Sequence, residues 1–589
     1  MLSDLPRLAL CDKNPAKYGK RVELYRFHTN SNTVYDLQWS RALYPGARLW
    51  PGRPSYRRWC NARRVIQATI LLLTALAVEA SARNIDGPCM DGARPPEFVS
   101  QVVAELDRLE PHTERWLYPV HWQRLVREIG QLRTDGLNPG YYQLPEIALI
   151  SSRQSDGAYP DNCHAELATL MLAWSVKDLT LGRLDPEELG LVWHQNPQRP
   201  DPADFAQKLH QAFHSSRGLS LAYDNARPSL AAYQNLRNAY SGRLDTLAMQ
   251  RPTIPEGPTL RSGDRNEQVA QLARRLVSQG YLPGGTPWPG GPEADTNSPR
   301  LFDDAMADAV AEFQRDHGLV ADGLVGKDTR AALNTPPAAW TARVRANLER
   351  IRWFSPYLMP DRLLVDIAGA RVRLFRDNEE VWQSRSQVGR AERKTPALTS
   401  VISHITVNPT WTIPPTIFYE DTLPAIQADP DYLYRNRLTV LDRTGTPLDP
   451  DQVDWSRPGN LLLRQNAGPG NALGEVAIRF PNPFSVYLHD TPSQRLFGTP
   501  ERFYSSGCVR VENALDLTDQ LFRDASGTVP RQLTEARRSG ETRNVSLPEG
   551  VPLVMAYWTA EADDAGRIRF RRDTYEEDGL VIDLLDREQ

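Results

Sequence analysis

Cysteine is scarce in this chain: only five stand among 589 residues. No two of them form a Cys-x-x-Cys pair, and no cluster of cysteine and histidine has the spacing of metal ligands. We therefore expect no zinc site, no other metal and no cofactor. Only Cys89, Cys163 and Cys508 follow residue 82. An oxidising compartment permits a Cys89 to Cys163 disulfide, which leaves Cys508 as a free thiol.

A strong charge of either sign is also missing. The chain has 69 Lys and Arg against 73 Asp and Glu, a formal net charge of −4. Because proteins that bind polyanions usually carry a basic excess, we predict no nucleic-acid partner. Hydrophobic residues make up 40% of the chain and there are 47 prolines, as in a globular protein with long connections. At roughly 150 residues per domain, this length predicts about three or four domains.

A hydrophobic run long enough to span a bilayer is missing as well, since such a helix needs about 20 apolar residues. The most apolar run, residues 65–78, follows a basic stretch and precedes Ala80-Ser81-Ala82, a small-x-small cleavage pattern. Residues 57–82 are therefore predicted to be a secretory signal peptide, with an uncleaved membrane anchor as the alternative. Residues 1–56 show no periodicity and receive no function, and we expect the true start to lie downstream of Met1.

The central part of the chain has helical periodicity. Between residues 95 and 250, apolar side chains recur at helical spacing, as in Val99, Val102 and Leu106. Amphipathic stripes of this kind usually form a core, and no catalytic constellation stands among them, so we predict a helical scaffold domain. Residues 260–335 predict a separate, compact module of three helices.

Beyond this module the apolar periodicity changes from helix to strand. Alternating residues such as Leu363 and Val365 are separated by turn residues, which is typical of a β-rich domain. We place this domain at residues 340–535. A stretch rich in proline, aspartate and tyrosine, residues 415–459, interrupts it, and long inserts of this kind usually form lids or binding loops. Residues 536–589 contain further strands, predicted to pack on the same domain.

One cysteine and one histidine form the candidate reactive pair. Cys508 follows Gly507 at the start of a short β-branched run, and His489 lies upstream in Tyr-Leu-His-Asp. A thiol attacks carbonyl carbon well only as the thiolate, and an imidazole within hydrogen-bond reach removes the proton and stabilises the charge. We therefore expect Cys508 to be kept ionised by His489.

The residues before His489 alternate in polarity. Such a strand turns its apolar side chains to the core and the others to the opposite face, here the wall of a site. The predicted core face comprises Phe484, Val486 and Leu488, and the predicted site face comprises Ser485, Tyr487 and His489.

This arrangement resembles the active-site signature of the L,D-transpeptidases with a YkuD-type catalytic domain. In that signature a histidine is followed by a Ser/Thr-x-Gly-Cys-x-Arg element, and here His489 is followed by Ser505-Ser506-Gly507-Cys508-Val509-Arg510. Many members carry a histidine just before the glycine, where this chain has Ser506, a departure that fits the large, YcbB-like branch. Residues 260–335 are similar to the peptidoglycan-binding module of bacterial wall enzymes, and residues 95–250 resemble the YcbB-like scaffold.

The resemblance implies an α+β multidomain protein: a helical scaffold, a three-helix peptidoglycan-binding-like module, and a β-rich L,D-transpeptidase domain with a capping insert over its groove. It also implies acyl transfer between peptidoglycan stem peptides in the periplasm, which makes 3→3 crosslinks. In that reaction Cys508 attacks the carbonyl of the third stem residue and releases D-alanine, while His489 acts as base and then as acid. The protein would be secreted across the inner membrane or anchored to it.

Further residues receive roles around this pair. The backbone N–H groups of Gly507 and Cys508 are natural oxyanion donors, with help from the phenol of Tyr487. Arg510 is predicted to bind a stem carboxylate or to stabilise the thiolate, with a surface ion pair as the alternative. The remaining candidates are Ser505 and Ser506, as turn-forming residues, and Trp411, which either floors the groove or fills the core.

Two other functions stay open. If water replaced the amine, the protein would be an L,D-carboxypeptidase that trims tetrapeptide stems. Nothing in Cys508 or His489 distinguishes the two acceptors, and the capping insert favours transfer. The second alternative is a wall-binding scaffold in which residues 95–335 act and the β-rich domain is inert. The intact Cys508, His489 and Arg510 argue against it.

Overall fold

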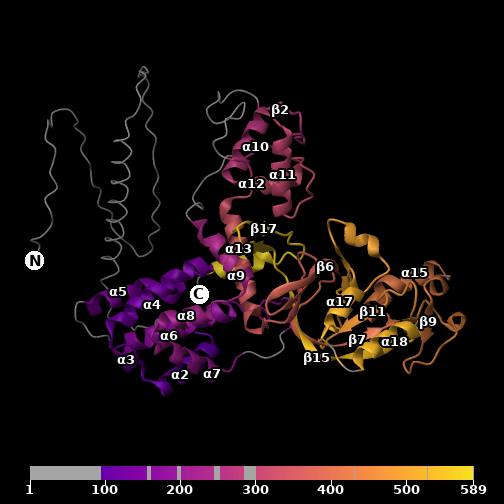
Figure 1. Cartoon of the computed structure of the whole chain (residues 1–589), viewed down its shortest axis with the longest axis horizontal. Helices are drawn as coiled ribbons and strands as arrows, with labels where there is room; N and C mark the ends of the chain where they lie inside the picture. Colours follow the sequence, from indigo (N-terminus) through magenta and orange to yellow (C-terminus); the bar gives the residue numbers. More distant parts are fainter. Residues whose placement is uncertain are drawn as a thin grey trace, which may run out of the picture. The chain divides into compact units, whose positions relative to one another are not determined.

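The computed structural model describes residues 95–155, 161–194, 200–244, 253–283, 300–429, 431–524, 526 and 528–587, all within the compact unit Asp86–Gln589 (Figure 1). The predicted signal segment, residues 57–82, and the unassigned residues 1–56 lie outside the described residues. Within the described part of the chain, no helix is both long and apolar enough to cross a bilayer.

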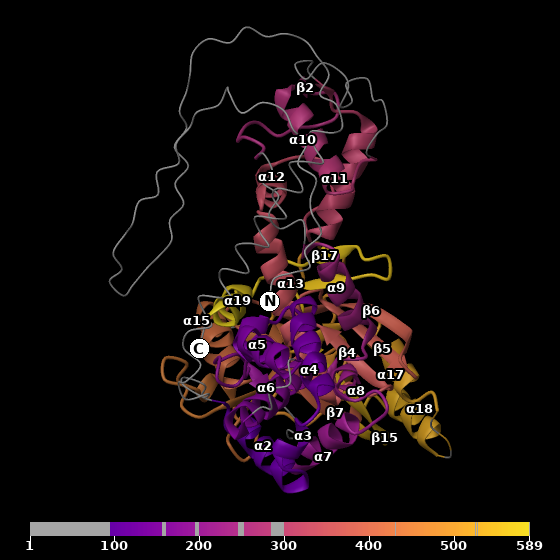
Figure 2. The same ribbon diagram turned by 90° about the vertical axis from the view of Figure 1, so that its left-hand side faces the viewer.

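Helices form the N-terminal part of the described chain. The principal ones are α2 (Glu97–Leu109), α4 (Pro119–Gln131), α6 (Asn162–Leu181), α7 (Pro202–Phe213), α8 (Leu219–Ala226) and α9 (Ala231–Ser241), and α2, α4, α6, α7 and α8 lie together in both views (Figure 1 and Figure 2). α2 buries Val99, Val102 and Leu106, the spacing that predicted a helix. Cys163, near the start of α6, is disulfide-bonded, while its predicted partner Cys89 lies outside the described residues.

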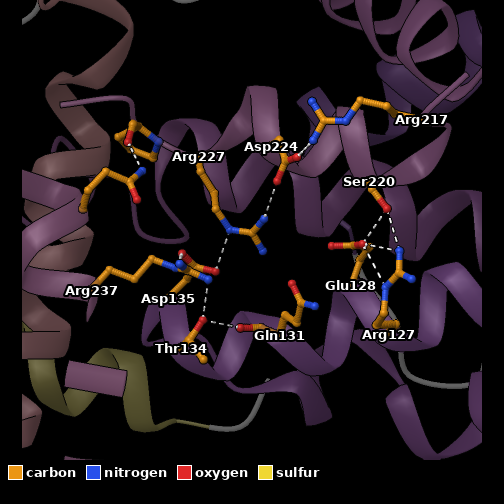
Figure 3. A network of polar contacts seen from close by, with 12 residues as sticks. Arg127, Glu128, Gln131, Thr134, Asp135, Arg217, Ser220, Asp224, Arg227 and Arg237 are labelled. Carbon is orange, nitrogen blue, oxygen red and sulfur yellow. Dashed lines mark hydrogen bonds and ion pairs between the residues drawn. The ribbon is translucent and has the colours of Figure 1, made fainter. Parts of the chain in front are cut away.

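A buried carboxylate ties the scaffold helices together. Asp135, at the end of the 3-10 turn η1 (Leu132–Asp135), is fully buried and pairs with Arg227 at 3.1 Å and with Arg237 at 2.6 Å (Figure 3). The hydroxyl of Tyr233 donates to the same carboxylate at 3.1 Å. A buried charge is tolerated only when it is paired and hydrogen-bonded. Asp135 therefore fixes how α9 and the end of α8 lie against α4.

Replacing Asp135 by alanine is expected to lower the free energy of unfolding by about 3–5 kcal/mol, because two arginines lose their buried partner. Urea unfolding followed by circular dichroism measures the change. Glu105 of α2 is the matched control, since it pairs with the exposed Arg108 at the surface, and Glu105→Ala is expected to cost about 1 kcal/mol or less. Equal losses in the two variants would contradict this role of Asp135.

Three helices form the small module predicted at residues 260–335. They are α10 (Glu267–Ser278), α11 (Asp304–Asp316) and α12 (Lys327–Asn334). α10 and α11 each begin at a capping side chain, Asn266 and Asp303, whose oxygen accepts a backbone N–H of the first turn. The module has a core of its own, which includes Val269, Leu272, Leu276, Val310 and Phe313.

A sheet of ten strands, counted in the described residues, organises the C-terminal part. Its central strands are β4 (Arg362–Asp366), β5 (Arg371–Arg376), β6 (Glu379–Gly389), β7 (Ala397–Val407), β11 (Val476–Arg479), β12 (Leu488–His489), β14 (Val509–Val511) and β15 (Arg543–Ala556). The order runs β7-β11-β12-β14-β6-β5-β4-β15, and β15 also pairs with β7, so the sheet closes on itself. The predicted α+β multidomain fold is confirmed.

Segments that precede and follow the central strands in the chain also belong to this sheet or pack on it. β15, from the C-terminal segment, lies between β4 and β7. The scaffold contributes the edge strand β1 (Trp193–His194), parallel to β7. After β15, the hairpin β16 (Ala560–Ala562) and β17 (Ile568–Phe570) and the helix α19 (Asp578–Asp586) share one hydrophobic cluster with α9 and with α13 (Pro337–Phe354). The scaffold and the sheet are thereby packed together.

The predicted capping insert, residues 415–459, folds within a small subdomain of its own. Three strands, β8 (Trp411–Thr412), β10 (Leu462–Gln465) and β9 (Leu438–Leu441), form its sheet, and the π-helix η5 (Phe418–Thr422) lies between β8 and β9 in the chain. Its separate core contains Ile413, Phe418, Ile426, Leu433, Val440 and Leu463. Because β8 and β10 lie beyond the predicted limits, the subdomain is larger than the sequence suggested.

Candidate active site

The predicted reactive residues lie on adjacent strands. The register of β12 places His489 opposite Ala477 of β11 on one side and opposite Arg510 of β14 on the other. Alternate residues of these strands are buried in the main core: Val476, Ile478, Leu488, Val509 and Val511. Successive side chains of a strand point to opposite faces. The face turned away from the core therefore carries Arg479, Tyr487, His489, Cys508 and Arg510.

Tyr487 is the direct neighbour of the thiol. The N–H of Val509 donates to the carbonyl of Tyr487 at 3.1 Å, which puts Tyr487 beside Cys508. Both the backbone and the phenol of Tyr487 act to lower the pKa of the Cys508 thiol. The guanidinium of Arg479 covers the phenol ring, 4.0 Å from its centre. Cys508 itself is a free, partly exposed cysteine.

The surroundings of the thiol and of the imidazole both favour the uncharged form, whereas the sequence analysis expects a thiolate. Burial raises the pKa of the Cys508 thiol and outweighs the opposite effect of Tyr487, Arg479 and Arg510. Burial, followed by the charge of Arg510, lowers the pKa of His489 to about 3. Both uncharged forms are therefore favoured, and charge separation is left to the reaction itself.

This neutral resting state predicts a rising pH profile for the alkylation of Cys508. Iodoacetamide reacts with the thiolate, so below the raised thiol pKa the rate should increase about tenfold per pH unit from about pH 6 to about pH 8. Intact-mass measurements at each pH give the rate, with Cys508→Ala as the baseline for the other cysteines. A plateau that begins near pH 5 would indicate a preformed ion pair and contradict this assignment.

His489 has a defined tautomer. Its Nδ1 lies 2.5 Å from the carbonyl oxygen of Asp490, and because a carbonyl only accepts, Nδ1 carries the proton. The lone pair is then on Nε2. The ring lies 5.6 Å from that of Tyr487, between centroids, and is 4% exposed. A neutral imidazole with a free Nε2 is suited to accept a proton.

The turn before Cys508 is held by its own hydrogen bonds. Gly507 has a φ of +111°, a conformation that L side chains rarely adopt. Its N–H donates to Oγ of Ser505 at 3.1 Å, and the hydroxyl of Ser505 donates to the carbonyl of Cys508 at 2.5 Å. The N–H of Gly507 is thus already satisfied. Of the two predicted oxyanion donors, the N–H of Cys508 is the one that this arrangement leaves available.

Two residues anchor this turn from other parts of the chain. The hydroxyl of Thr395 donates to the carbonyl of Gly507 at 2.8 Å and accepts the N–H of Gly389 at 2.8 Å. The hydroxyl of Tyr575 donates to the carbonyl of Gly389 at 2.8 Å and accepts the N–H of Thr395 at 3.0 Å. This chain of bonds fixes the carbonyl that immediately precedes the nucleophile.

An amide holds Arg510 on the site face. Its Nη1 donates to Oε1 of Gln387, a fully buried residue of β6, at 3.1 Å. Burial lowers the pKa of Arg510, and the nearby Cys508 raises it. Its Nε has no hydrogen-bond partner among the described residues. Arg510 therefore lies beside the thiol and is held by an amide, an arrangement unlike the surface ion pair that was its alternative.

Comparison with known proteins decides the class of this domain. Residues 360–526 match the family of L,D-transpeptidase catalytic domains. The chain carries an L,D-transpeptidase catalytic domain. Residues 265–333 match the family described as "Putative peptidoglycan binding domain", and residues 113–239 match the "Scaffold domain" family. The chain thus combines a scaffold domain, a peptidoglycan-binding-like domain and an L,D-transpeptidase domain, which is the YcbB-like domain architecture that the sequence resembled.

One curated relative is also described as an L,D-transpeptidase. A "Putative L,D-transpeptidase" of Haemophilus influenzae is 34% identical over 226 residues, which cover 37% of this chain and 45% of the relative. The match thus spans about half the length of that relative. Among solved structures, "Structure of the Ldtfm-avibactam carbamoyl enzyme" is 13% identical and covers 34% of this chain and 49% of its own, with a TM-score of 0.17. An L,D-transpeptidase from Mycobacterium smegmatis is 16% identical. The match covers 33% of this chain and 58% of that structure's chain, with a TM-score of 0.16.

Arg393 joins the capping insert of the L,D-transpeptidase domain to the turn at its nucleophile. Its Nη1 donates to Oγ of Ser506 at 2.9 Å and to Asp421 of η5 at 2.5 Å. Its Nη2 pairs with Glu420. Ser506 occupies the position where many members of this family have histidine. In this chain that position connects the turn to the insert.

Two predicted residues lie elsewhere in the L,D-transpeptidase domain. Trp411 begins β8 and packs, partly buried, against the core of the capping insert, so it fills that core and does not floor the site. Phe484 is exposed, in contrast to its predicted place in the core. The reason is that β12 begins only at Leu488 and that Ser485 adopts a left-handed φ of +57°. The predicted core residues Val486 and Leu488 are buried.

The sequence analysis missed five residues of the L,D-transpeptidase site: Gln387, Arg393, Thr395, Arg479 and Tyr575. For Arg479 a signal was present, because it ends the alternating run Val-Ala-Ile-Arg, whose apolar members predict a strand with an arginine on the outer face. Thr395 and Tyr575 stand in no motif. Their role depends on a loop and a C-terminal segment that meet only in the folded chain.

Proposed function

We propose that this protein is a peptidoglycan L,D-transpeptidase that forms 3→3 crosslinks between stem peptides through a thioester on Cys508. The observation that carries the proposal is the shared strand face on which the partly exposed residue Cys508 lies beside Tyr487, near a neutral His489. Arg479 and Arg510 flank the same face. A nucleophile, a base and fixed cations suit acyl transfer from a peptide that ends in a carboxylate.

In the first half-reaction, Nε2 of His489 takes the proton from the thiol of Cys508 as the sulfur attacks the carbonyl carbon of the third stem residue. The neutral resting pair fits this order, because the thiolate is made only when its electrons form the new carbon–sulfur bond. The tetrahedral intermediate then breaks its carbon–nitrogen bond. His489 gives the proton to the leaving nitrogen, and the terminal D-alanine departs from a thioester on Cys508.

In the second half-reaction, the side-chain amine of a neighbouring stem attacks the thioester. His489 takes a proton from the attacking nitrogen and returns it to the sulfur as the carbon–sulfur bond breaks. The products are an amide between two third residues and the free thiol of Cys508. No redox partner or metal enters the balance of either step.

Charge that develops in these steps has donors nearby. The N–H of Cys508 is available to the oxyanion, and the phenol of Tyr487, which acts on the pKa of the thiol, is a second candidate donor. The guanidinium groups of Arg479 and Arg510 suit the carboxylate of the terminal D-alanine, since arginine pairs with carboxylates in a bidentate manner. The Nε of Arg510 is buried and has no partner among the described residues.

Transfer is favoured over hydrolysis by the link between the capping insert and the nucleophile turn. Arg393 holds η5 against Ser506, next to the thioester position, where an insert can exclude water and orient an amine. Trimming by water, as an L,D-carboxypeptidase, and a wall-binding scaffold without turnover remain the alternatives. Because stem peptides lie outside the inner membrane, we also propose a periplasmic, wall-associated location, with residues 57–82 as signal or anchor.

Incubation with a disaccharide-tetrapeptide donor, followed by mass spectrometry of enzyme and products, tests the proposal. We expect an acyl adduct on the enzyme, loss of D-alanine, and dimers joined between third residues. Tripeptide monomers without dimers, at saturating acceptor, would support the carboxypeptidase. Sacculus binding without adduct or product would leave only the scaffold function.

A further inference from the structure

Two histidines and a glutamate meet at the edge of the scaffold, away from the thiol. His210 lies near the end of α7, His214 follows it by one helical turn, and Glu110 follows α2. One ligand atom from each of the three residues lies within 4.8 Å of the other two. The two imidazole rings have centroids 4.5 Å apart. The proposed acyl transfer uses none of these groups.

The hydrogen bonds within this cluster leave one buried nitrogen without a partner among the described residues. Nε2 of His214 lies 2.8 Å from Oε2 of Glu110, a normal hydrogen bond. Nδ1 of His210 lies 3.8 Å from the same oxygen, which is too far for one. That nitrogen is buried and has no hydrogen-bond partner among the described residues. Buried polar atoms are nearly always satisfied, so a further group is expected between the three side chains.

We propose that Glu110, His210 and His214 bind a zinc ion that links α2 to α7. Zinc takes nitrogen and oxygen ligands at about 2.0–2.1 Å in a tetrahedron, which places the ligand atoms about 3.3 Å from one another. The two separations from Oε2 of Glu110, 2.8 Å and 3.8 Å, bracket that value, and the two histidine ligand atoms lie within 4.8 Å of each other, so the three side chains have to draw together around the ion. The side chain of His214 is 46% exposed, which leaves room for water as the fourth ligand.

The two helices hold the ligands in place before any ion arrives. Phe98 of α2 and Phe205 of α7 pack edge to face, 5.5 Å between ring centroids. Leu106 and Leu209, close to the ligands on each helix, are buried in the same core. A site on packed helices requires little movement of the backbone to bind its ion. Zinc would therefore strengthen an existing contact.

A fixed cation limits the affinity of this site. Nε of Arg115 lies 3.6 Å from Oε2 of Glu110, and its guanidinium is held by the carbonyl of Leu106 and the hydroxyl of Thr169. Its positive charge opposes that of the ion, while its position orients the carboxylate as an outer-shell partner does. We expect a micromolar dissociation constant, weaker than for cysteine-rich structural sites.

This site revises the expectation that the chain binds no metal. The spacing His-x-x-x-His was present in the sequence and places two imidazoles on one helix face. Its third ligand, Glu110, comes from a different helix. Two histidines at this spacing do not by themselves indicate a metal site, because the third ligand is supplied only by the packing of α2 on α7.

Isothermal titration of the full-length protein with zinc chloride tests the proposal, in a Cys508→Ala background so that this thiol cannot bind the ion. We expect one ion per chain at the site, and a loss of affinity of about tenfold or more in His210→Ala and in Glu110→Gln. His214→Gln serves as a third variant that is safe for folding, because the side chain is exposed. His164→Ala is the matched control, since His164 faces Asp161 at 3.0 Å in the same domain. It should leave binding unchanged.

Zinc-edge X-ray absorption provides a second readout. Only nitrogen and oxygen ligands at about 2.0 Å are expected. The proposal is overturned by sulfur ligands at about 2.3 Å, by binding that survives the His210 and Glu110 substitutions, or by the absence of binding in the parent protein. Because neither readout depends on turnover, failure here leaves the proposed transpeptidase function untouched.

Discussion

Cys508→Ala is expected to form no acyl adduct with a tetrapeptide donor and to lose kcat by more than about 10⁴-fold, because the residue that bonds to the acyl group is gone. Neighbouring groups cannot replace it. Oγ of Ser505 donates to the carbonyl of Cys508, and Oγ of Ser506 accepts from Arg393. Neither hydroxyl has a base beside it among the described residues. Intact-mass spectrometry measures the adduct, and release of D-alanine measures kcat.

Two further variants make this result interpretable. Ser506→Ala removes the alternative hydroxyl but keeps the thiol, so adduct formation should continue. Cys508→Ser keeps the size of the side chain and offers a much poorer nucleophile, so its kcat should fall nearly as far as that of the alanine variant. Unchanged circular dichroism in all three excludes unfolding as the cause. An adduct on Cys508→Ala at wild-type rate would show that acylation takes place elsewhere.

The local parts of the fold could be predicted because periodicity reports which face is buried. Val99, Val102 and Leu106 gave the face of α2 correctly. Val486, which precedes β12, and Leu488, its first residue, were also correctly assigned to the core. The closure of the sheet could not be predicted in this way. β15 pairs with strands that begin at residues 362 and 397, and no local pattern records a pairing of such long range.

The candidate site likewise has features that local sequence predicts and features that depend on the folded structure. Cys508, His489 and Tyr487 come from two short segments with a readable motif and strand alternation, and the parallel pairing of β12 with β14 brings them together. The charge state of the pair could not be read from the motif, because it depends on how far the groups are removed from water. Burial dominates here, and it shifts the pKa of thiol and imidazole in opposite directions.

His489→Asn is expected to lower kcat by about 10²–10⁴-fold, the usual contribution of a general acid–base group. Asparagine suits this test, because its side-chain amide can still donate to the carbonyl of Asp490, as Nδ1 of His489 does. The base at Nε2 is removed with little change to that contact. His121→Asn is the matched control, since Nδ1 of His121 likewise bonds a backbone carbonyl, that of Arg115, at 2.8 Å, but does so among the scaffold helices.

The pH profile separates loss of a base from general damage to the site. With a His489 pKa of about 3, the wild-type enzyme has its base available throughout the neutral range, so kcat should change little between about pH 5 and pH 8. Without that base, only preformed thiolate can attack, and below the raised pKa of Cys508 the residual rate should increase about tenfold per pH unit. A flat profile in His489→Asn would mean that another group takes the proton. The role of His489 would then be confined to shaping the site.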